Sequence, residues 1–158
     1  DAGLVSVRRA SVPVISIGNL TLGGTGKTPL VAWMARTLVA TGRRPGIVSR
    51  GYGAAAGATS DEAAELALVA PGVPHVADRD RVAAAVRAVA AGVDCVVLDD
   101  GFQHRRLARD LDVVAIDATD PFGGGRIFPR GLLRESLGGL RRANAVVLTR
   151  AEIGRAHV

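Results

Sequence analysis

The sequence predicts a three-layer α/β domain in which a mostly parallel sheet is flanked by helices. Short runs of apolar, β-branched residues recur along the chain, and stretches with helical periodicity separate them. A glycine-rich turn lies between the first run and the first helical stretch. The length of 158 residues is enough for one domain with a sizeable core. We therefore expect residues 1–158 to form a single lobe.

Five runs have the composition of buried parallel strands, because each is four to six residues long and apolar on both faces. They are residues 12–17, 46–49, 95–98, 113–116 and 145–148. Polar residues or glycine follow each run. Open α/β sheets bind ligands at the carboxyl ends of their strands, so we expect functional residues in these following segments.

Three segments between the runs are predicted to be helices: residues 27–41, 61–70 and 80–91. In the first of them, Leu30, Met34 and Leu38 lie four residues apart and form one apolar face. Two long loops are rich in small residues, namely 52–60 and 119–131. Loops of this length inside a compact domain are often functional.

The charge of the chain excludes one class of partner. Its 20 basic and 15 acidic residues give a formal net charge of +5, but the basic residues are scattered or paired and only 3% of residues are aromatic. Surfaces that bind nucleic acids combine clustered basic residues with stacking aromatic rings, so we expect no nucleic-acid partner. Nineteen of the basic residues are arginine, and the one lysine is Lys27.

The single cysteine excludes an internal disulfide and a cysteine-based zinc site. Cys95 lies in an apolar run, which predicts a place in the core. No apolar run approaches the ~18 residues that a transmembrane helix needs.

The glycine-rich turn has the pattern of a phosphate-binding loop, G-x-x-x-x-G-K-S/T, with threonine at the first position instead of glycine. Small residues let backbone N–H groups surround phosphate oxygens, and the following helix adds its positive N-terminal end. The lysine is expected to bind the β- and γ-phosphates, and the hydroxyl after it to bind Mg²⁺. The expected nucleotide-binding residues are Thr21, Gly23, Gly24, Thr25, Gly26, Lys27 and Thr28. This predicts a P-loop NTPase-like domain.

An acidic pair ends the third apolar run, where Asp99 and Asp100 follow Val96-Val97-Leu98. A carboxylate at the end of a strand beside a phosphate loop can hold Mg²⁺ or one of its waters. We therefore expect Thr28, Asp99 and Asp100 to bind the metal. Side chains alternate along a strand, so the two carboxylates point opposite ways, and the sequence leaves open which of them touches the ion.

Several further blocks accompany the phosphate loop of residues 13–29. They are Ser49-Arg50-Gly51-Tyr52-Gly53, Asp61-Glu62, Asp78-Arg79-Asp80, Asp99-Asp100-Gly101-Phe102-Gln103-His104, Leu107-Ala108-Arg109-Asp110-Leu111 and Phe128-Pro129-Arg130-Gly131-Leu132-Leu133-Arg134-Glu135. In this order they cover nearly the whole chain, and the chain resembles the tetraacyldisaccharide 4′-kinase family, the lipid A kinases of Gram-negative bacteria.

The resemblance implies a kinase that uses ATP and Mg²⁺ to phosphorylate the 4′-hydroxyl of a tetraacyldisaccharide 1-phosphate in lipid A biosynthesis. It implies active-site positions at Asp61, Asp99, Asp100, His104, Arg134 and Glu135. Asp61 matches an acid that helps to activate the sugar hydroxyl, although an acid at a helix start is also typical of a capping residue. Arg134 suits an anion clamp, and the alternative for Arg134-Glu135 is a surface ion pair.

The same resemblance implies an organisation and a location. Family members begin with a hydrophobic, membrane-associated segment and continue into a C-terminal lobe that closes the cleft. We expect this chain to be the N-terminal catalytic lobe without either part, and to be inactive alone. The implied location is the cytoplasmic face of the bacterial inner membrane, where a lobe that is itself soluble makes peripheral contact. The implied partner is the lipid disaccharide, with no obligate protein partner.

Two alternatives stay open. A nucleotide switch or metallochaperone-type NTPase that acts through a protein partner also has a phosphate loop. Such proteins often carry an extra lysine in the loop, or a lysine-containing motif for the GTP base, and this chain has one lysine. The other alternative is a truncated domain that folds but binds nucleotide poorly.

Overall fold

The computed structural model describes residues 6–51 and 61–151 of the chain. Its centre is a six-stranded sheet with the order β3-β2-β4-β1-β5-β6, and every pair of neighbouring strands is parallel. The strands are β1 Val14–Asn19, β2 Pro45–Ser49, β3 His75–Ala77, β4 Cys95–Asp99, β5 Leu111–Asp117 and β6 Ala145–Thr149. The predicted fold class is therefore confirmed.

Five of the six strands coincide with the apolar runs of the sequence, and β3 does not. β3 is three residues long and begins with His75, so it has too few apolar residues to form a run. It pairs only with β2, at the edge of the sheet.

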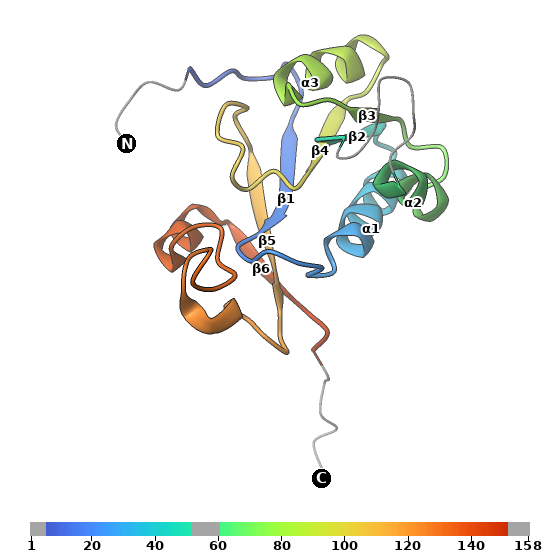
Figure 1. Ribbon diagram of the computed structural model, residues 1–158. Coiled ribbons are helices and arrows are strands. Elements are labelled where there is room, and N and C mark those ends of the chain that lie inside the picture. The colour runs from blue at the N-terminus through green and yellow to red at the C-terminus, as the bar shows by residue number, and fades with distance from the viewer. Residues whose placement is uncertain (1–5, 52–60, 152–158) are drawn as a thin grey trace.

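Helices cover both faces of the sheet (Figure 1). They are α1 Lys27–Ala40, α2 Asp61–Val69 and α3 Arg81–Ala90, close to the predicted ranges. The start of α3 is capped by Asp80, whose carboxylate accepts hydrogen bonds from the N–H groups of Val82 and Ala83.

The core has one layer on each face, and the alternation along β4 separates them. Val96 and Leu98 pack with α3, at Ala84 and Ala88. Val97 points to the other face, where it belongs to a cluster with residues of α1 and α2. The free thiol of Cys95 is buried as predicted, and burial raises its pKa to about 11.

A third apolar cluster lies beside the carboxyl ends of β1 and β5, and its members are Leu20, Phe102, Val114, Ile116 and Leu133. The segment that covers it follows β5 and includes two short 3-10 helices, η1 Gly123–Gly125 and η2 Leu137–Arg142. The predicted loop 119–131 therefore contains η1. Among the described residues, no helix is both long and apolar enough to cross a bilayer.

Candidate functional site: a carboxylate between two cations beside the phosphate loop

The phosphate loop connects β1 to α1, as the sequence predicts. Gly26 adopts a left-handed conformation with φ 72° and precedes the first residue of α1. No side chain caps this end of α1, and its first turn contains no acid. The first N–H groups of the helix therefore face the loop with no side-chain acceptor, and this arrangement suits an anion.

Thr21, which replaces the first glycine of the motif, is buried and forms an antiparallel bridge with Leu133. Two main-chain hydrogen bonds extend this pairing. Leu22 N–H donates to the carbonyl of Leu132, and Arg134 N–H donates to the carbonyl of Leu20, both at 2.7 Å. A β-branched residue suits this extended conformation, so threonine fits the start of the loop.

Lys27 extends from the start of α1 to two acceptors at the end of the sheet. Its Nζ donates to Oδ1 of Asn19 at 2.9 Å and to Oδ1 of Asp100 at 2.8 Å. Asn19 is the last residue of β1, and Asp100 follows the last residue of β4. The ammonium is thus held at the carboxyl edge of the two central strands.

Asp100 carries the opposite charge at the centre of the site. Nη1 of Arg134 donates to both of its carboxylate oxygens at 2.8 Å, while Lys27 binds one of them. Burial alone would raise the pKa of Asp100, but the two cations outweigh burial and hold it below its usual value. The carboxylate is therefore ionised at neutral pH.

A tight turn presents Asp100 to solvent. Asp100 itself has φ 52°, and the next residue lies so close to the sheet that a Cβ on Gly101 would be 2.6 Å from Oγ of Ser16 and from Leu98. The N–H of Gly101 donates to the carbonyl of Ile17. Glycine is needed here because only a residue without a side chain lets the turn approach β1.

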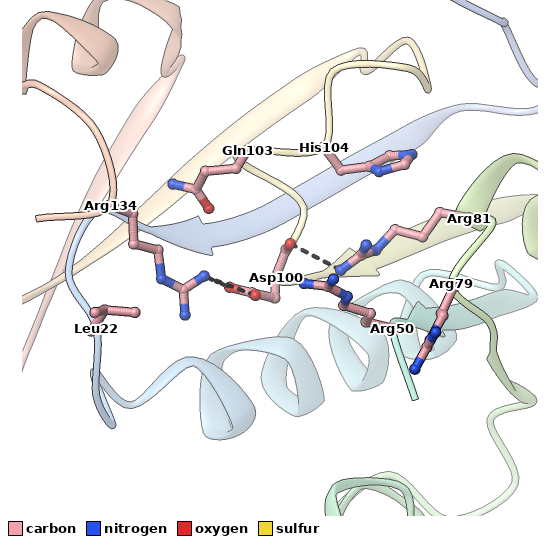
Figure 2. Close-up of a pocket in the computed structure, with 8 residues that line it drawn as sticks. All are labelled: Leu22, Arg50, Arg79, Arg81, Asp100, Gln103, His104 and Arg134. Atoms are coloured by element: carbon pink, nitrogen blue, oxygen red, sulfur yellow. Dashed lines mark hydrogen bonds and ion pairs between the residues drawn. The ribbon is translucent and has the colours of Figure 1, made fainter. Parts of the chain in front are cut away.

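The structure separates the two aspartates that the sequence placed together. Asp99 belongs to β4 and is 1% exposed, whereas Asp100 lines a cavity of about 480 Å³. Figure 2 shows Arg134 on one side of Asp100 and Arg50 and Arg81 on the other. The cavity is lined by Leu22, Arg50, Arg79, Arg81, Asp100, Gln103, His104 and Arg134.

Three of the lining arginines come from the carboxyl ends of neighbouring strands. Arg50 follows β2, Arg79 follows β3, and Arg81 begins α3 and donates to the carbonyl of Asp100 at 3.3 Å. With Arg134 they make the cavity strongly cationic. Sequence reasoning singled out Arg50 within its block but missed Arg81. The sequence does contain a signal for Arg81. Asp80 is a residue type that caps helix starts, so Arg81 is expected to begin a helix close to the end of the preceding strand.

His104, for which the sequence analysis predicts an active-site position, lines the same cavity. Burial lowers its pKa, and the charges of Arg81, Arg106 and Arg109 lower it further. Its Nε2 is buried and forms no hydrogen bond with any described residue. The imidazole is therefore neutral at pH 7.

Glu135 lies outside the set of residues that line the cavity. Nη2 of Arg142 donates to both of its carboxylate oxygens at 2.8 Å, and Nε2 of Gln103 donates to Oε1 at 3.1 Å. The guanidinium of Arg142 also stacks on the ring of Phe102 at 4.5 Å. In this structure Glu135 connects η2 to the turn that carries Gln103.

Two predicted parts of the site lie outside the described residues. The side chain of Asp61 is one, although the backbone of Asp61 starts α2. The other is the segment 52–60, which includes the Tyr52 and Gly53 of the block that begins at Ser49.

Known proteins are similar to this chain over nearly its whole length. The sequence profile of the tetraacyldisaccharide-1-P 4′-kinase family matches residues 1–158. The chain belongs to this family. A tetraacyldisaccharide 4′-kinase of Anaeromyxobacter sp. (strain Fw109-5) is 48% identical over 96% of the chain, and one of Geobacter sulfurreducens is 44% identical over 98%. The chain spans 46% and 49% of these two relatives, about half their length.

A solved structure of the kinase family agrees with this assignment. The crystal structure of the family member LpxK from Aquifex aeolicus, in complex with ATP, superimposes with a TM-score of 0.84 at 36% identity, over 94% of this chain and 51% of that one. The signal recognition particle receptor FtsY of Elizabethkingia anophelis has a TM-score of 0.61 at 16% identity, over 91% of this chain and 52% of that one. The second likeness shows only that the fold is shared.

Proposed function

We propose that this chain is the catalytic lobe of a kinase that transfers the γ-phosphate of ATP to the 4′-hydroxyl of tetraacyldisaccharide 1-phosphate in lipid A biosynthesis. One observation carries the proposal above all: Lys27 and Arg134 hold the carboxylate of Asp100 between them, where the phosphate loop meets an arginine-lined cavity. Membership of the tetraacyldisaccharide-1-P 4′-kinase family supports this substrate class.

The phosphate loop fits a nucleotide. Gly23 and Gly24 are exposed, and a Cβ at Gly23 would meet nothing within 4 Å, so space for phosphate oxygens lies beside their backbone. The uncapped start of α1 faces the same space. We assign ATP binding to Thr21, Gly23, Gly24, Thr25, Gly26, Lys27 and Thr28.

The residues present also fit Mg²⁺. In the described part of the chain, no group of three or more His, Cys, Asp or Glu side chains could hold a metal. Mg²⁺ is usually held by one or two carboxylates together with the phosphates of its substrate. We assign the ion to Thr28, Asp99 and Asp100. Of the two acids, Asp100 reaches the cavity and Asp99 is buried at the end of β4. The ion would neutralise charge on the phosphates.

The remaining side chains have separate proposed roles in the transfer. Lys27 and Arg134 stabilise negative charge on the phosphoryl group as it passes to the sugar oxygen and ADP leaves. Asp61 accepts the proton of the attacking hydroxyl. His104, neutral at pH 7, contacts the substrate from the wall of the cavity. Glu135 acts indirectly, because it positions Gln103 at the cavity.

We infer that residues 1–158 are one lobe, that it works at the cytoplasmic face of the inner membrane through peripheral contact, and that it needs a second lobe to close the cleft. The substrate is the lipid disaccharide. Phosphate transfer by residues 1–158 alone is therefore expected to be absent, whereas ATP binding is expected to be present.

Thermal unfolding with and without Mg²⁺-ATP tests the nucleotide site directly. Ligand at about 100 times its Kd stabilises the folded state by about 2.7 kcal/mol, so the melting temperature of the chain should rise. Lys27→Ala should abolish that rise, and Arg36→Ala, on the exposed surface of the same helix, should retain it. A rise with GTP in preference to ATP would favour the nucleotide-switch alternative. No rise with either nucleotide would contradict the proposal.

A further inference from the structure

An exposed apolar surface borders the arginine-lined cavity. We call it the rim patch, and it consists of the side chains of Leu22, Phe122, Ile127, Phe128 and Leu132. Main-chain hydrogen bonds connect the segments that carry these residues, and Phe128 N–H donates to the carbonyl of Leu133. Leu22 N–H donates to Leu132, and Leu132 N–H in turn donates to Gly123, the neighbour of Phe122. Leu22 also lines the cavity, so the patch reaches the mouth of the site.

The aromatic residues of the patch are conspicuous in a chain that has only three phenylalanines. Phe102 is completely buried in the core, whereas Phe122 is 40% exposed and Phe128 is 62% exposed. Scattered exposed apolar residues need no explanation, but several on paired segments beside a ligand cavity indicate an interaction surface. The two phenylalanines in this segment therefore serve something other than the core.

The charges of the same segment indicate what the surface contacts. Arg126 and Arg130 are exposed, and neither guanidinium forms a hydrogen bond or ion pair within residues 6–51 and 61–151. Asp120, the one acid between positions 119 and 131, accepts a hydrogen bond from the N–H of Gly123. The patch thus combines exposed apolar side chains with cations that have no protein partner there.

We propose that the rim patch enters the interfacial region of an anionic phospholipid bilayer. Side chains such as phenylalanine, isoleucine and leucine insert at the boundary between headgroups and acyl chains, and neighbouring arginines bind anionic headgroups. Because Leu22 belongs to both the patch and the cavity lining, this contact places the cavity mouth at the lipid surface. This inference rests on the proposed function, which already includes peripheral contact with a membrane, and adds the residues that make that contact.

Tryptophan fluorescence can locate the contact, because the chain has one tryptophan, Trp33, which lies on α1 and is 53% exposed. The reporter chain carries Trp33→Phe together with Phe128→Trp, and the unchanged chain is the matched control. Each is mixed with vesicles of phosphatidylcholine and phosphatidylglycerol whose acyl chains are brominated. We expect the reporter at position 128 to lose about half of its emission or more and Trp33 to keep its emission, since bromine quenches only rings that reach the acyl chains.

Variants then test the two components of the patch by co-sedimentation with the same lipids, without bromine. Phe122→Ser with Phe128→Ser should weaken vesicle binding about tenfold or more, and Trp33→Ser should leave it unchanged. Arg126→Gln with Arg130→Gln should remove the preference for phosphatidylglycerol over phosphatidylcholine, whereas Arg36→Gln should not. The shift in melting temperature with ATP should be the same in all these chains.

Three results would overturn the inference. They are equal quenching at the two positions, no quenching at position 128, and patch variants that change self-association measured by light scattering but leave vesicle binding intact. An absent ATP shift together with quenching at position 128 would contradict the proposed function while supporting the bilayer contact. The two proposals can therefore fail separately.

Discussion

Arg134 binds both carboxylate oxygens of Asp100 at 2.8 Å through one nitrogen, although 34 residues separate the two in sequence. Lys27, at the start of α1, binds one of the same oxygens. The partly buried carboxylate of Asp100 therefore balances the positive charges of Lys27 and Arg134 beside the phosphate loop. Removal of its charge would leave the cations facing each other.

Asp100→Asn tests this arrangement. We expect it to lower the free energy of unfolding by about 1–3 kcal/mol at pH 7, because the amide no longer balances Lys27 and Arg134. Asparagine tolerates the left-handed backbone of Asp100, so the loss reports charge and not strain. Urea unfolding is the measurement.

Acid provides the control for this variant. The pKa of Asp100 is lower in the folded protein than in the unfolded chain, so its contribution is present above the ordinary pKa of about 3.9 and is lost as the pH falls through the folded value. The difference between the two proteins should therefore shrink in acid. A constant difference from neutral to strongly acid pH would show that Asp100 acts through packing.

His104 predicts a second pH dependence of stability, which arises from a buried neutral imidazole. Its pKa is lowered by burial and by three arginines, so near and below pH 6.5 the unfolded chain binds more protons than the folded protein. The free energy of unfolding therefore rises with pH up to about 6.5, and His104 makes the folded protein less stable in mild acid. His104→Gln should flatten the dependence of unfolding free energy between about pH 5 and 7. An unchanged slope would contradict the assignment.

Gly101→Ala should destabilise the turn that presents Asp100. The added methyl would lie 2.6 Å from both Leu98 and Ser16, which are buried in the sheet and cannot move away. Overpacking of this kind typically costs about 1–3 kcal/mol. Gly138→Ala is the matched control, because the nearest atom to its Cβ is 3.6 Å away. Equal melting temperatures for the two variants would contradict the close approach.

Glu135 and Arg142 predict an energetic coupling. A double-mutant cycle with Glu135→Gln and Arg142→Gln should give a coupling energy of about 1 kcal/mol, since the guanidinium binds both carboxylate oxygens. The ATP-dependent shift of melting temperature should persist in Glu135→Gln, because this side chain does not line the cavity. Loss of the shift would instead indicate direct contact with the nucleotide.

Most of the fold was predictable because buried parallel strands are apolar on both faces and easy to find in a sequence. β3 was missed because three edge residues leave little apolar signal. The phosphate loop and Asp100 were predictable from local motifs. The convergence of Arg50, Arg79 and Arg81 was not, since it depends on the order in which β2, β3 and β4 pair.

The different surroundings of Arg134 and Glu135 were also not predictable from the sequence. The motif places them side by side, but Arg134 belongs to an extended segment that pairs with the start of the phosphate loop. Successive side chains of an extended segment point to opposite sides. Arg134 therefore reaches the cavity while Glu135 turns to Arg142.

The pairing of residues 20–22 with residues 132–134 uses backbone atoms, at Leu22 with Leu132 and at Arg134 with Leu20. Side-chain replacements other than proline leave both hydrogen bonds possible at these positions, whereas a one-residue insertion or deletion inside either segment would shift the register. Such a shift would turn Arg134 away from Asp100 and bring Glu135 toward it. The register of the two segments therefore depends on their length, and insertions are compatible with the site only in the loops outside them.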